Sequence, residues 1–246
     1  QFIGKDNIPF HTVIFPSTLL GSGENWTTLY HMSSTEYLNY ESGKFSKSKG
    51  IGVFGTDCVE SGIPADVWRF YIYYNRPEKS DYLFTWKDFQ EKVNSELIGN
   101  LGNLINRTLT FAKRFFNGKI LEGSKDSDFW KTVCEYETKI TDYLDRAELK
   151  DAYHQIFELS GFGNKIFQDS EPWKMKNDNP EKAQRLISDL VYLVRDIALM
   201  IQPYTPETSK KVLSFISADN FKWENLGNPL GKIEVLDTQI LFTKLE

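Results

Sequence analysis

Two different patterns of apolar positions divide the sequence near residue 80. Before that point, short apolar runs such as residues 11–15 and 37–40 are broken by Gly, Ser and Thr, which is typical of strands and loops. Residues 66–74 are expected to form a short helix. From residue 88 onward, apolar positions recur every three or four residues, which predicts amphipathic helices. The pattern therefore predicts an α/β part over residues 1–80 and an all-α part over residues 81–246.

The all-α part is expected to hold five helices joined by short connections. The first runs over residues 88–115, and Gly118 stands just past its end, where helices often stop. The second covers residues 128–144. The third is expected to begin at Asp145, with Glu148 three residues later as in a capping box.

The last two helices carry the clearest start signals. Asn179-Pro180 and Thr205-Pro206 each place a capping residue before a proline at the first helical position. Five amphipathic helices with short connections indicate a helical bundle. The tail over residues 233–245 alternates weakly and is expected to be a terminal strand or an extended strap.

Composition excludes several classes of protein. With 40% hydrophobic and 26% charged residues over 246 positions, the chain is not a disordered tail. A net charge of -5 argues against a wholly basic nucleic-acid coat protein but leaves room for a local basic site, since salt screens charges over about 8 Å. Cys58 and Cys134 cannot form a four-cysteine zinc site, and the three histidines are scattered, so no metal site is expected. No apolar run reaches the roughly 18 residues of a membrane span.

The segment richest in possible chemistry is a lysine-serine loop. Lys44-Phe45-Ser46-Lys47-Ser48-Lys49-Gly50 follows an expected hairpin turn at residues 41–43. Lysine ammonium groups and serine hydroxyls can surround a polyphosphate and neutralise charge that develops during its transfer. On composition alone, a solvated hairpin tip is the better interpretation of this loop.

Three segments in collinear order carry a resemblance to a known family. Lys-Phe-Ser-Lys-Ser resembles the Lys-Met-Ser-Lys-Ser signature of class I aminoacyl-tRNA synthetases, with Phe45 in place of Met. Residues 2–11 (FIGKDNIPFH) are similar to the strand and turn that precede this loop in methionyl-tRNA synthetases. Residues 75–81 (NRPEKSD) resemble the eukaryotic-type branch of that family. The chain is therefore identified as a member of the methionyl-tRNA synthetase family, and its α/β part as a remnant of a Rossmann-like catalytic domain.

The resemblance implies a two-step ligase reaction with ATP, Mg²⁺, L-methionine and tRNA(Met). Lys47 would contact the phosphates, Lys44 would support the loop, and Ser46 and Ser48 would add donors to the nucleotide. Gly4 and Asp6 match the family positions that lie against the adenylate, and His11 matches a histidine near the methionine pocket. Taken without the family, Asp6 is equally suited to capping a helix, and His11 to a core position.

The family pattern also has a part with no match in this chain. Class I synthetases pair the lysine loop with an upstream His-Ile-Gly-His-like signature, and no His-x-Gly-His occurs here. The chain is therefore expected to be a C-terminal fragment of a cytoplasmic ligase and to be inactive by itself. Accessory or multi-synthetase partners would bind through segments not present here.

A second constellation lies in the helical part. Asn103 and Arg107 are four residues apart and so project from one helix face. In methionyl-tRNA synthetases an Asn-x-x-x-Arg pair on this helix and a later Pro-Trp, here Pro172-Trp173, contact anticodon bases, and Asn164 fits the helix that leads to that loop. Without the family resemblance, the better interpretation of Trp173 is a core residue that fills the helical bundle.

Three other functions remain open from the sequence. A free-standing RNA-binding module would not need the intact loop at residues 44–48. A class I synthetase for isoleucine, valine or leucine would share that loop, but Asn103, Arg107 and Pro172-Trp173 favour methionine. A purely structural helical bundle is the weakest alternative.

Overall fold

A computed structural model describes residues 4–41, 43–123, 125, 127–218 and 221–246. Contacts divide the chain into two compact units that interleave along the sequence. The first comprises residues 1–52 and 76–84, and the second comprises residues 53–75 and 85–246.

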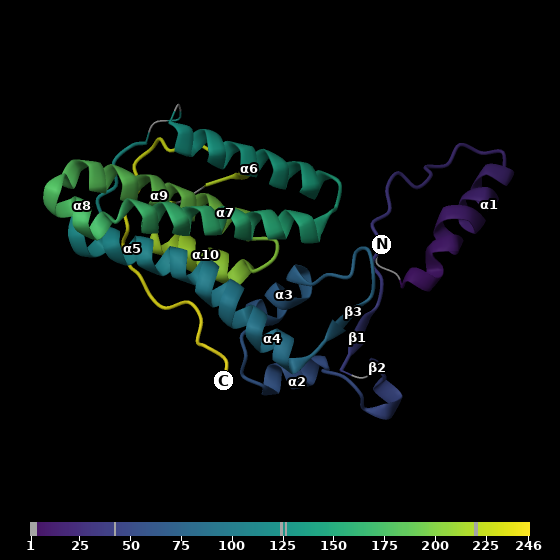
Figure 1. Cartoon of the computed structure of the whole chain (residues 1–246). Coiled ribbons are helices and arrows are strands. Elements are labelled where there is room, and N and C mark those ends of the chain that lie inside the picture. The colour runs from purple at the N-terminus through teal and green to yellow at the C-terminus, as the bar shows by residue number, and fades with distance from the viewer. Residues whose placement is uncertain (1–3, 42, 124, 126, 219–220) are drawn as a thin grey trace. The chain divides into compact units, whose positions relative to one another are not determined.

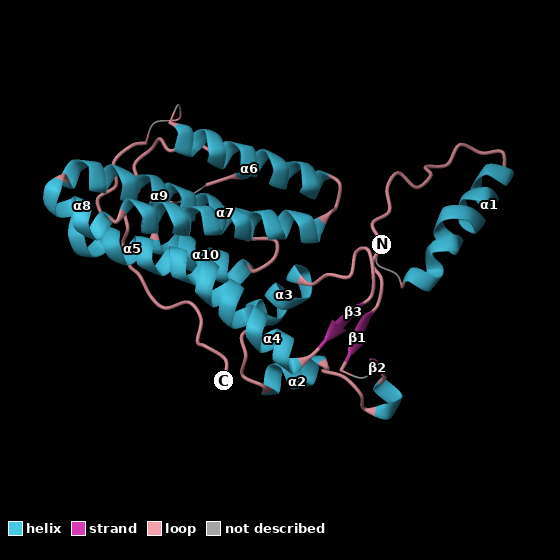
Figure 2. Cartoon of the chain, viewed as in Figure 1, coloured by secondary structure: helices cyan, strands magenta, loops and turns pink. Residues whose placement is uncertain are grey.

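The first unit is built around a small mixed sheet, drawn in magenta in Figure 2. Strand β1 (Leu38–Tyr40) lies in the middle, antiparallel to β2 (Gly43–Lys44) and parallel to β3 (Tyr82–Phe84). The short hairpin between β1 and β2 carries the lysine loop, as the sequence predicts, although Ser42 of the turn and the run at residues 2–3 lie outside the described residues. This sheet and the helices below confirm an α/β part followed by a helical bundle.

One apolar run of the first unit is helical, so the strand expected over residues 11–15 is wrong. A single turn at Lys5–Asn7 leads into a wide helical turn at Phe10–Ile14 and then into α1 (Phe15–Gly21). Pro9 and Pro16 fix φ near the helical value at the start of these segments, and the Thr12 hydroxyl bonds back to the Ile8 carbonyl at 2.8 Å. Local backbone geometry therefore prevails over the strand-like run of apolar residues.

The second unit is the helical bundle (Figure 1). Its first long helix begins at Trp86 and continues without a break to Phe116, which confirms the predicted helix over residues 88–115. The helices of this unit are α2 (Gly55–Glu60), α3 (Ala65–Tyr74), α4 (Trp86–Lys92), a wide-turned segment at Val93–Gly102, α5 (Asn103–Phe116), α6 (Asp128–Asp145), α7 (Leu149–Ser170), α8 (Pro172–Asp178), α9 (Pro180–Met200), α10 (Pro206–Phe215) and a short turn at Trp223–Asn225.

Helix α9 forms the centre of this bundle. It packs against α5, α7, α8 and α10, and residues 190–201 are all buried. A helix that is buried on every side belongs to the core of its domain. Its start confirms the predicted cap, because the Asn179 side chain accepts from the Lys182 N–H at 3.0 Å with Pro180 at the first helical position.

The predicted start of the third helix at Asp145 is wrong. Asp145 is the last residue of α6, and α7 begins at Leu149 after a left-handed residue, Ala147. The Glu148 side chain makes no capping hydrogen bond at the start of α7, and its carboxylate lies 3.1 Å from the Arg146 guanidinium. Because α6 continues through Asp145, that residue lies inside a helix and cannot be the N-cap of the next one.

The C-terminal residues form an extended strap along the bundle. Val235 pairs with Ile216, and its N–H donates to the Gly118 carbonyl at 2.9 Å. Gly118 has φ +74°, and a Cβ there would lie 2.3 Å from the Val235 carbonyl oxygen, so this position requires glycine. Farther on, the Asn94 side chain holds both backbone polar groups of Leu245, at 2.8 and 2.9 Å.

Candidate functional site

The lysine loop is a tight, exposed turn of the first unit. After β2 the backbone is closed by reciprocal Ser46–Ile51 hydrogen bonds of 2.8 and 2.9 Å. Lys47–Lys49 form one helical turn between these two residues, and Gly50 reverses the chain with φ +62°. The Ser46 and Ser48 hydroxyls lie 3.4 Å apart. The loop therefore presents lysines and hydroxyls together to solvent.

Phe45 attaches this loop to the sheet. Its ring lies 5.3 Å from the ring of Tyr40 on β1 and fills the space above Gly52, where a Cβ would come within 2.3 Å of it. Phe45 replaces the methionine of the family signature. An apolar side chain of similar length performs the same packing, so the substitution leaves the polar groups of the loop in place.

Tyr37 brings two separate sequence motifs together. Its hydroxyl donates to both carboxylate oxygens of Asp6, at 2.9 and 3.0 Å. The Lys44 ammonium lies 5.1 Å from the centre of its ring, and the Lys5 ammonium lies 3.9 Å from it. The turn at residues 4–7 and the first lysine of the loop therefore meet on one phenol. The sequence pattern indicates nothing for Tyr37 beyond its place as the first residue of the apolar run at residues 37–40.

Neighbouring charges hold this cluster in place. Lys5 forms an ion pair with Glu36 and lies 4.0 Å from Asp81, and the hydrogen bond to Glu36 raises the pKa of Lys5. The backbone N–H of Tyr37 donates to Asp81 at 2.9 Å and lowers the pKa of that carboxyl. The hydrogen bond to Asp6 raises the pKa of the Tyr37 phenol, so the phenol remains a donor at neutral pH.

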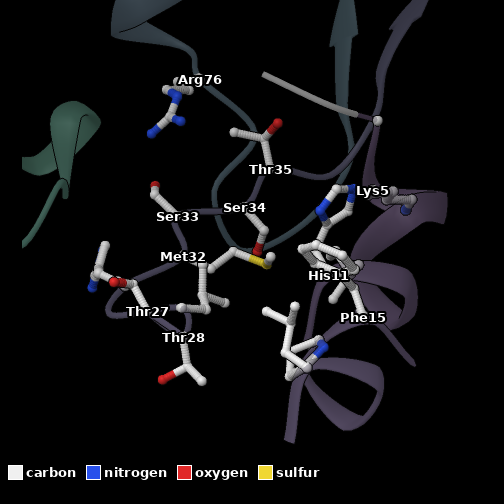
Figure 3. A pocket seen from close by; sticks show the side chains of 16 residues that line it. Lys5, His11, Phe15, Thr27, Thr28, Met32, Ser33, Ser34, Thr35 and Arg76 are labelled. Carbon is white, nitrogen blue, oxygen red and sulfur yellow. The ribbon is translucent and has the colours of Figure 1, made fainter. Parts of the chain in front are cut away.

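A cavity of about 510 Å³ opens beside the same turn. Figure 3 shows His11 and Phe15 on its helical side and Thr28 and Met32 on the side of the loop over residues 27–35. Gly4 belongs to the same lining. The size and mixed lining suit a small molecule with apolar and polar ends.

The described residues offer neither a metal site nor a membrane-spanning helix. In the part of the chain that the structure describes, no three His, Cys, Asp or Glu side chains gather to hold a metal ion. Among the helices with described residues, none is both long and apolar enough to cross a membrane.

In the second unit, Asn164 brings the predicted helical pair together. Its amide oxygen accepts from Asn103 Nδ2 at 3.0 Å and from Arg107 Nη1 at 3.5 Å. Its amide nitrogen donates to the Asn100 carbonyl at 2.9 Å, which fixes the orientation of the amide. Asn103 and Arg107 therefore point from α5 toward the same side chain of α7.

The Phe167 ring contacts both Arg107 of this pair and the indole of Trp173. The Arg107 guanidinium lies 3.8 Å from the centre of the Phe167 ring, and that ring lies 6.2 Å from the indole of Trp173. Trp173 keeps 37% of its surface exposed, whereas Pro172 beside it is buried as the first residue of α8. Partial burial lowers the pKa of Arg107. We call Asn103, Arg107, Asn164, Phe167 and Trp173 the α5–α8 surface.

Comparison with known families covers almost the whole chain. Residues 1–109 match the model for tRNA synthetases class I (M), and residues 120–243 match the anticodon binding domain of methionyl tRNA ligase. The chain belongs to the methionyl-tRNA synthetase family. This confirms the family expected from the lysine loop and the Asn-x-x-x-Arg pair.

Similar proteins agree with this assignment to the methionyl-tRNA synthetases. A methionine–tRNA ligase of Treponema denticola is 52% identical over 277 residues, covering 100% of this chain and 35% of that protein. One from Borrelia garinii is 53% identical over 247 residues, covering 100% of this chain and 34% of that protein. The chain thus spans about a third of the length of these curated relatives.

Solved structures show the same fold. The apo form of Mycobacterium tuberculosis methionyl-tRNA synthetase superposes with a TM-score of 0.80 at 20% identity, over 99% of this chain and 49% of that one. The same synthetase in complex with methionyl-adenylate gives a TM-score of 0.73 at 23% identity, over 87% of this chain and 43% of that one. The predicted fold class is therefore confirmed.

Proposed function

We propose that this chain is the lysine-loop and anticodon-binding part of a cytoplasmic methionine–tRNA ligase. In the first step, a carboxylate oxygen of methionine attacks the α-phosphorus of ATP, and pyrophosphate leaves. In the second step, a terminal ribose hydroxyl of tRNA(Met) attacks the carbonyl carbon of methionyl-adenylate, and AMP leaves. The family membership of residues 1–109 and 120–243 supports both halves of this assignment.

The observation that carries the proposal is the meeting of Asp6 and Lys44 on Tyr37. An ionised carboxylate is suited to accept hydrogen bonds from the ribose hydroxyls of ATP. The lysine loop adjoins the same point, so Lys47, Ser46 and Ser48 can reach the phosphates of a nucleotide that contacts Asp6. Positive charge placed where the pyrophosphate leaves stabilises the transition state more than the ground state.

The cavity beside Gly4 is proposed to hold methionine. His11, Phe15 and Met32 line it, so it offers apolar surface to a thioether together with a polar ring. Mg²⁺ accompanies ATP in our proposal and neutralises its phosphates. No residue of this chain is assigned to the ion, because no cluster of acidic ligands occurs among the described residues.

The α5–α8 surface is proposed to bind the anticodon. Anticodon bases are single-stranded and can be splayed out onto a protein surface. The half-exposed indole of Trp173, positioned by Pro172, gives one base a stacking face, and Asn103 and Arg107 present donors to base edges. This surface favours methionine as the amino acid over other class I specificities. Any accessory protein partner would bind through segments outside these residues.

A single exchange in the lysine loop tests the proposal. In the full-length ligase that contains this chain, Lys47→Ala should slow ATP–pyrophosphate exchange by about 100-fold or more, because it removes transition-state charge stabilisation. Methionine affinity should stay within about twofold, since the ground-state pocket is untouched. Lys49→Ala, two residues away in the same turn, is the matched control and should behave almost like the wild type. Equal losses in exchange rate and methionine affinity would contradict the proposal.

A free-standing RNA-binding module predicts a different result. For such a module the lysine loop has no catalytic task, so the full-length protein would show no ATP–pyrophosphate exchange for either lysine variant to change. The experiment therefore separates a ligase from a binding module.

A further inference from the structure

Phe115 is an exposed aromatic ring that no part of the proposed anticodon contact uses. It keeps 38% of its surface exposed near the end of α5. The Lys176 ammonium of α8 lies 4.4 Å from the ring centre, and the Arg114 guanidinium lies 5.2 Å from it. The ring is therefore flanked by two cations from two different helices.

A continuous run of rings joins Phe115 to Trp173. The centre of the Phe115 ring lies 4.5 Å from that of Phe111, which lies 5.8 Å from that of Phe167, which lies 6.2 Å from that of Trp173. Phe111 and Phe167 are buried, and the two end rings are exposed to almost the same extent. The buried pair thus holds two open stacking faces in a fixed relation within one unit.

The charge around these rings is opposite to that of the chain. Helix α5 carries Arg107, Lys113 and Arg114 and no carboxylate, whereas on α8 Lys174 is paired with the Glu171 carboxylate at 2.7 Å and Lys176 stands against Asp178. The whole chain has a net charge of -5. The two helices that present Phe115 and Trp173 therefore form a local basic patch, which is suited to a polyanion.

We propose that Phe115 is a second stacking position for a base of the same RNA strand, next to the base at Trp173, with Lys176 and Arg114 on the flanking phosphates. This inference rests on the proposed anticodon function and extends its binding surface. Alternating aromatic faces and mobile cations are the features by which proteins bind single-stranded nucleic acid without reading its sequence. The Lys176 ammonium can leave the ring face to a base, because lysine is a point charge on a flexible stem.

Stacking on Phe115 and the charge of Lys176 should contribute separately to RNA affinity, and one titration series can measure both. The probe is a fluorescently labelled stem–loop with the methionine anticodon, bound to the 246-residue chain at several salt concentrations. Phe115→Leu and Phe115→Ala should weaken binding by about 5-fold or more at every salt concentration, since stacking is lost and no charge changes. Lys176→Gln should reduce the slope of log affinity against log salt by about 0.7, as expected when one phosphate contact is lost from a single strand. Phe115→Tyr keeps the ring face and should restore binding.

A matched pair on another helix provides the control. On α6 the Lys139 ammonium lies 5.7 Å from the centre of the Tyr136 ring, but that helix carries five carboxylates, including Glu135 and Asp142, against two lysines. Tyr136→Leu and Lys139→Gln should leave both the affinity and the salt slope unchanged. Each variant is first checked for an unaltered thermal melting curve.

Trp173→Ala, measured in the same series, separates this inference from the proposed function. Loss of affinity in the Phe115 variants with an unchanged slope, together with the reduced slope of Lys176→Gln, supports the second stacking position. If Phe115→Leu and Phe115→Ala bind like the wild type while Trp173→Ala is weakened, the second position is refuted and the anticodon contact stands. If Phe115→Leu, Phe115→Ala and Trp173→Ala all bind like the wild type, both the second stacking position and the anticodon contact are refuted.

Discussion

The Tyr37 hydroxyl lies 2.9 and 3.0 Å from the two carboxylate oxygens of Asp6. A single donor shared between both oxygens fixes the plane of the carboxylate and leaves its remaining lone pairs free to accept. The ring of the same tyrosine lies beneath the Lys44 ammonium. Tyr37 is therefore placed to orient the carboxylate proposed to contact the nucleotide and to support the lysine loop at the same time.

Removing only the Tyr37 hydroxyl should affect nucleotide binding more than chemistry. In the full-length ligase, Tyr37→Phe should raise KM for ATP by about 5- to 10-fold, the size expected for loss of a hydrogen bond to a charged group. Its kcat in ATP–pyrophosphate exchange should change by less than about threefold, because the ring beneath Lys44 remains. Tyr37→Leu removes the ring as well and should lower kcat further.

Tyr30→Phe is the control for this pair, since Tyr30 is fully exposed. A fall in kcat of Tyr37→Phe with an unchanged KM would show that the hydroxyl does not act through the nucleotide contact.

Asn164 should be as important for RNA binding as the residues that it orients. Asn164→Ala removes the oxygen to which both Asn103 and Arg107 donate. We expect about 10-fold weaker binding of an anticodon stem–loop, because two polar side chains lose their common partner and must be ordered on binding. Fluorescence anisotropy measures this directly.

The matched variant is Gln168→Ala. Gln168 accepts from the other terminal nitrogen of Arg107 at 3.5 Å, whereas Asn164 accepts from Arg107 at the same distance and also from Asn103 at 3.0 Å. Gln168→Ala should weaken binding of the stem–loop by no more than about twofold, as expected for the loss of one long, weak hydrogen bond. If the two variants weaken binding equally, the orienting role of Asn164 is wrong.

A buried acidic pair should make the stability of the bundle depend on pH. Glu137 of α6 lies against Asp196 of α9, and burial raises the pKa of Glu137 to about 9. The folded chain therefore keeps a proton that the unfolded chain releases above the ordinary carboxyl range. Since the folded state binds more protons in that window, this group stabilises the fold fully below about pH 4.5, and the stabilisation is lost as the pH rises toward about 9.

Glu137→Gln mimics the protonated carboxyl and should flatten this dependence. Thermal melting between about pH 5 and pH 9 should show a smaller decrease in Tm with rising pH than the wild type. Glu135→Gln, which alters an exposed carboxylate on the same helix, should leave the wild-type slope intact. Parallel slopes for the wild type and Glu137→Gln would contradict a protonated Glu137.

The helices and their proline-marked starts follow directly from local sequence. At Asn179-Pro180 one side chain and one fixed dihedral decide where α9 begins, so no distant contact is needed to predict it. The start of α7 was mispredicted for the opposite reason. There α6 extends through Asp145 and a left-handed residue, Ala147, separates it from α7, and the sequence pattern does not indicate where the first helix ends.

The residues that complete each site were missed because their signal is spatial. Tyr37 is one tyrosine among twelve, and only the fold brings Asp6 and Lys44 onto it. Phe167 reads as an ordinary core position at helical spacing, although its ring carries Arg107 on one side and adjoins Trp173. Family resemblance indicates the residues expected to contact the ligands, whereas the groups that hold them are brought together only by the fold.

Competitive binding tests whether the α5–α8 surface recognises the methionine anticodon. The 246-residue chain is titrated with a stem–loop that carries this anticodon and with the same stem–loop changed at one anticodon base. We expect at least about tenfold tighter binding of the first RNA, equal to about 1.4 kcal/mol, and loss of that preference in Trp173→Ala. Equal affinity of the wild-type chain for the two RNAs would contradict anticodon recognition by the α5–α8 surface.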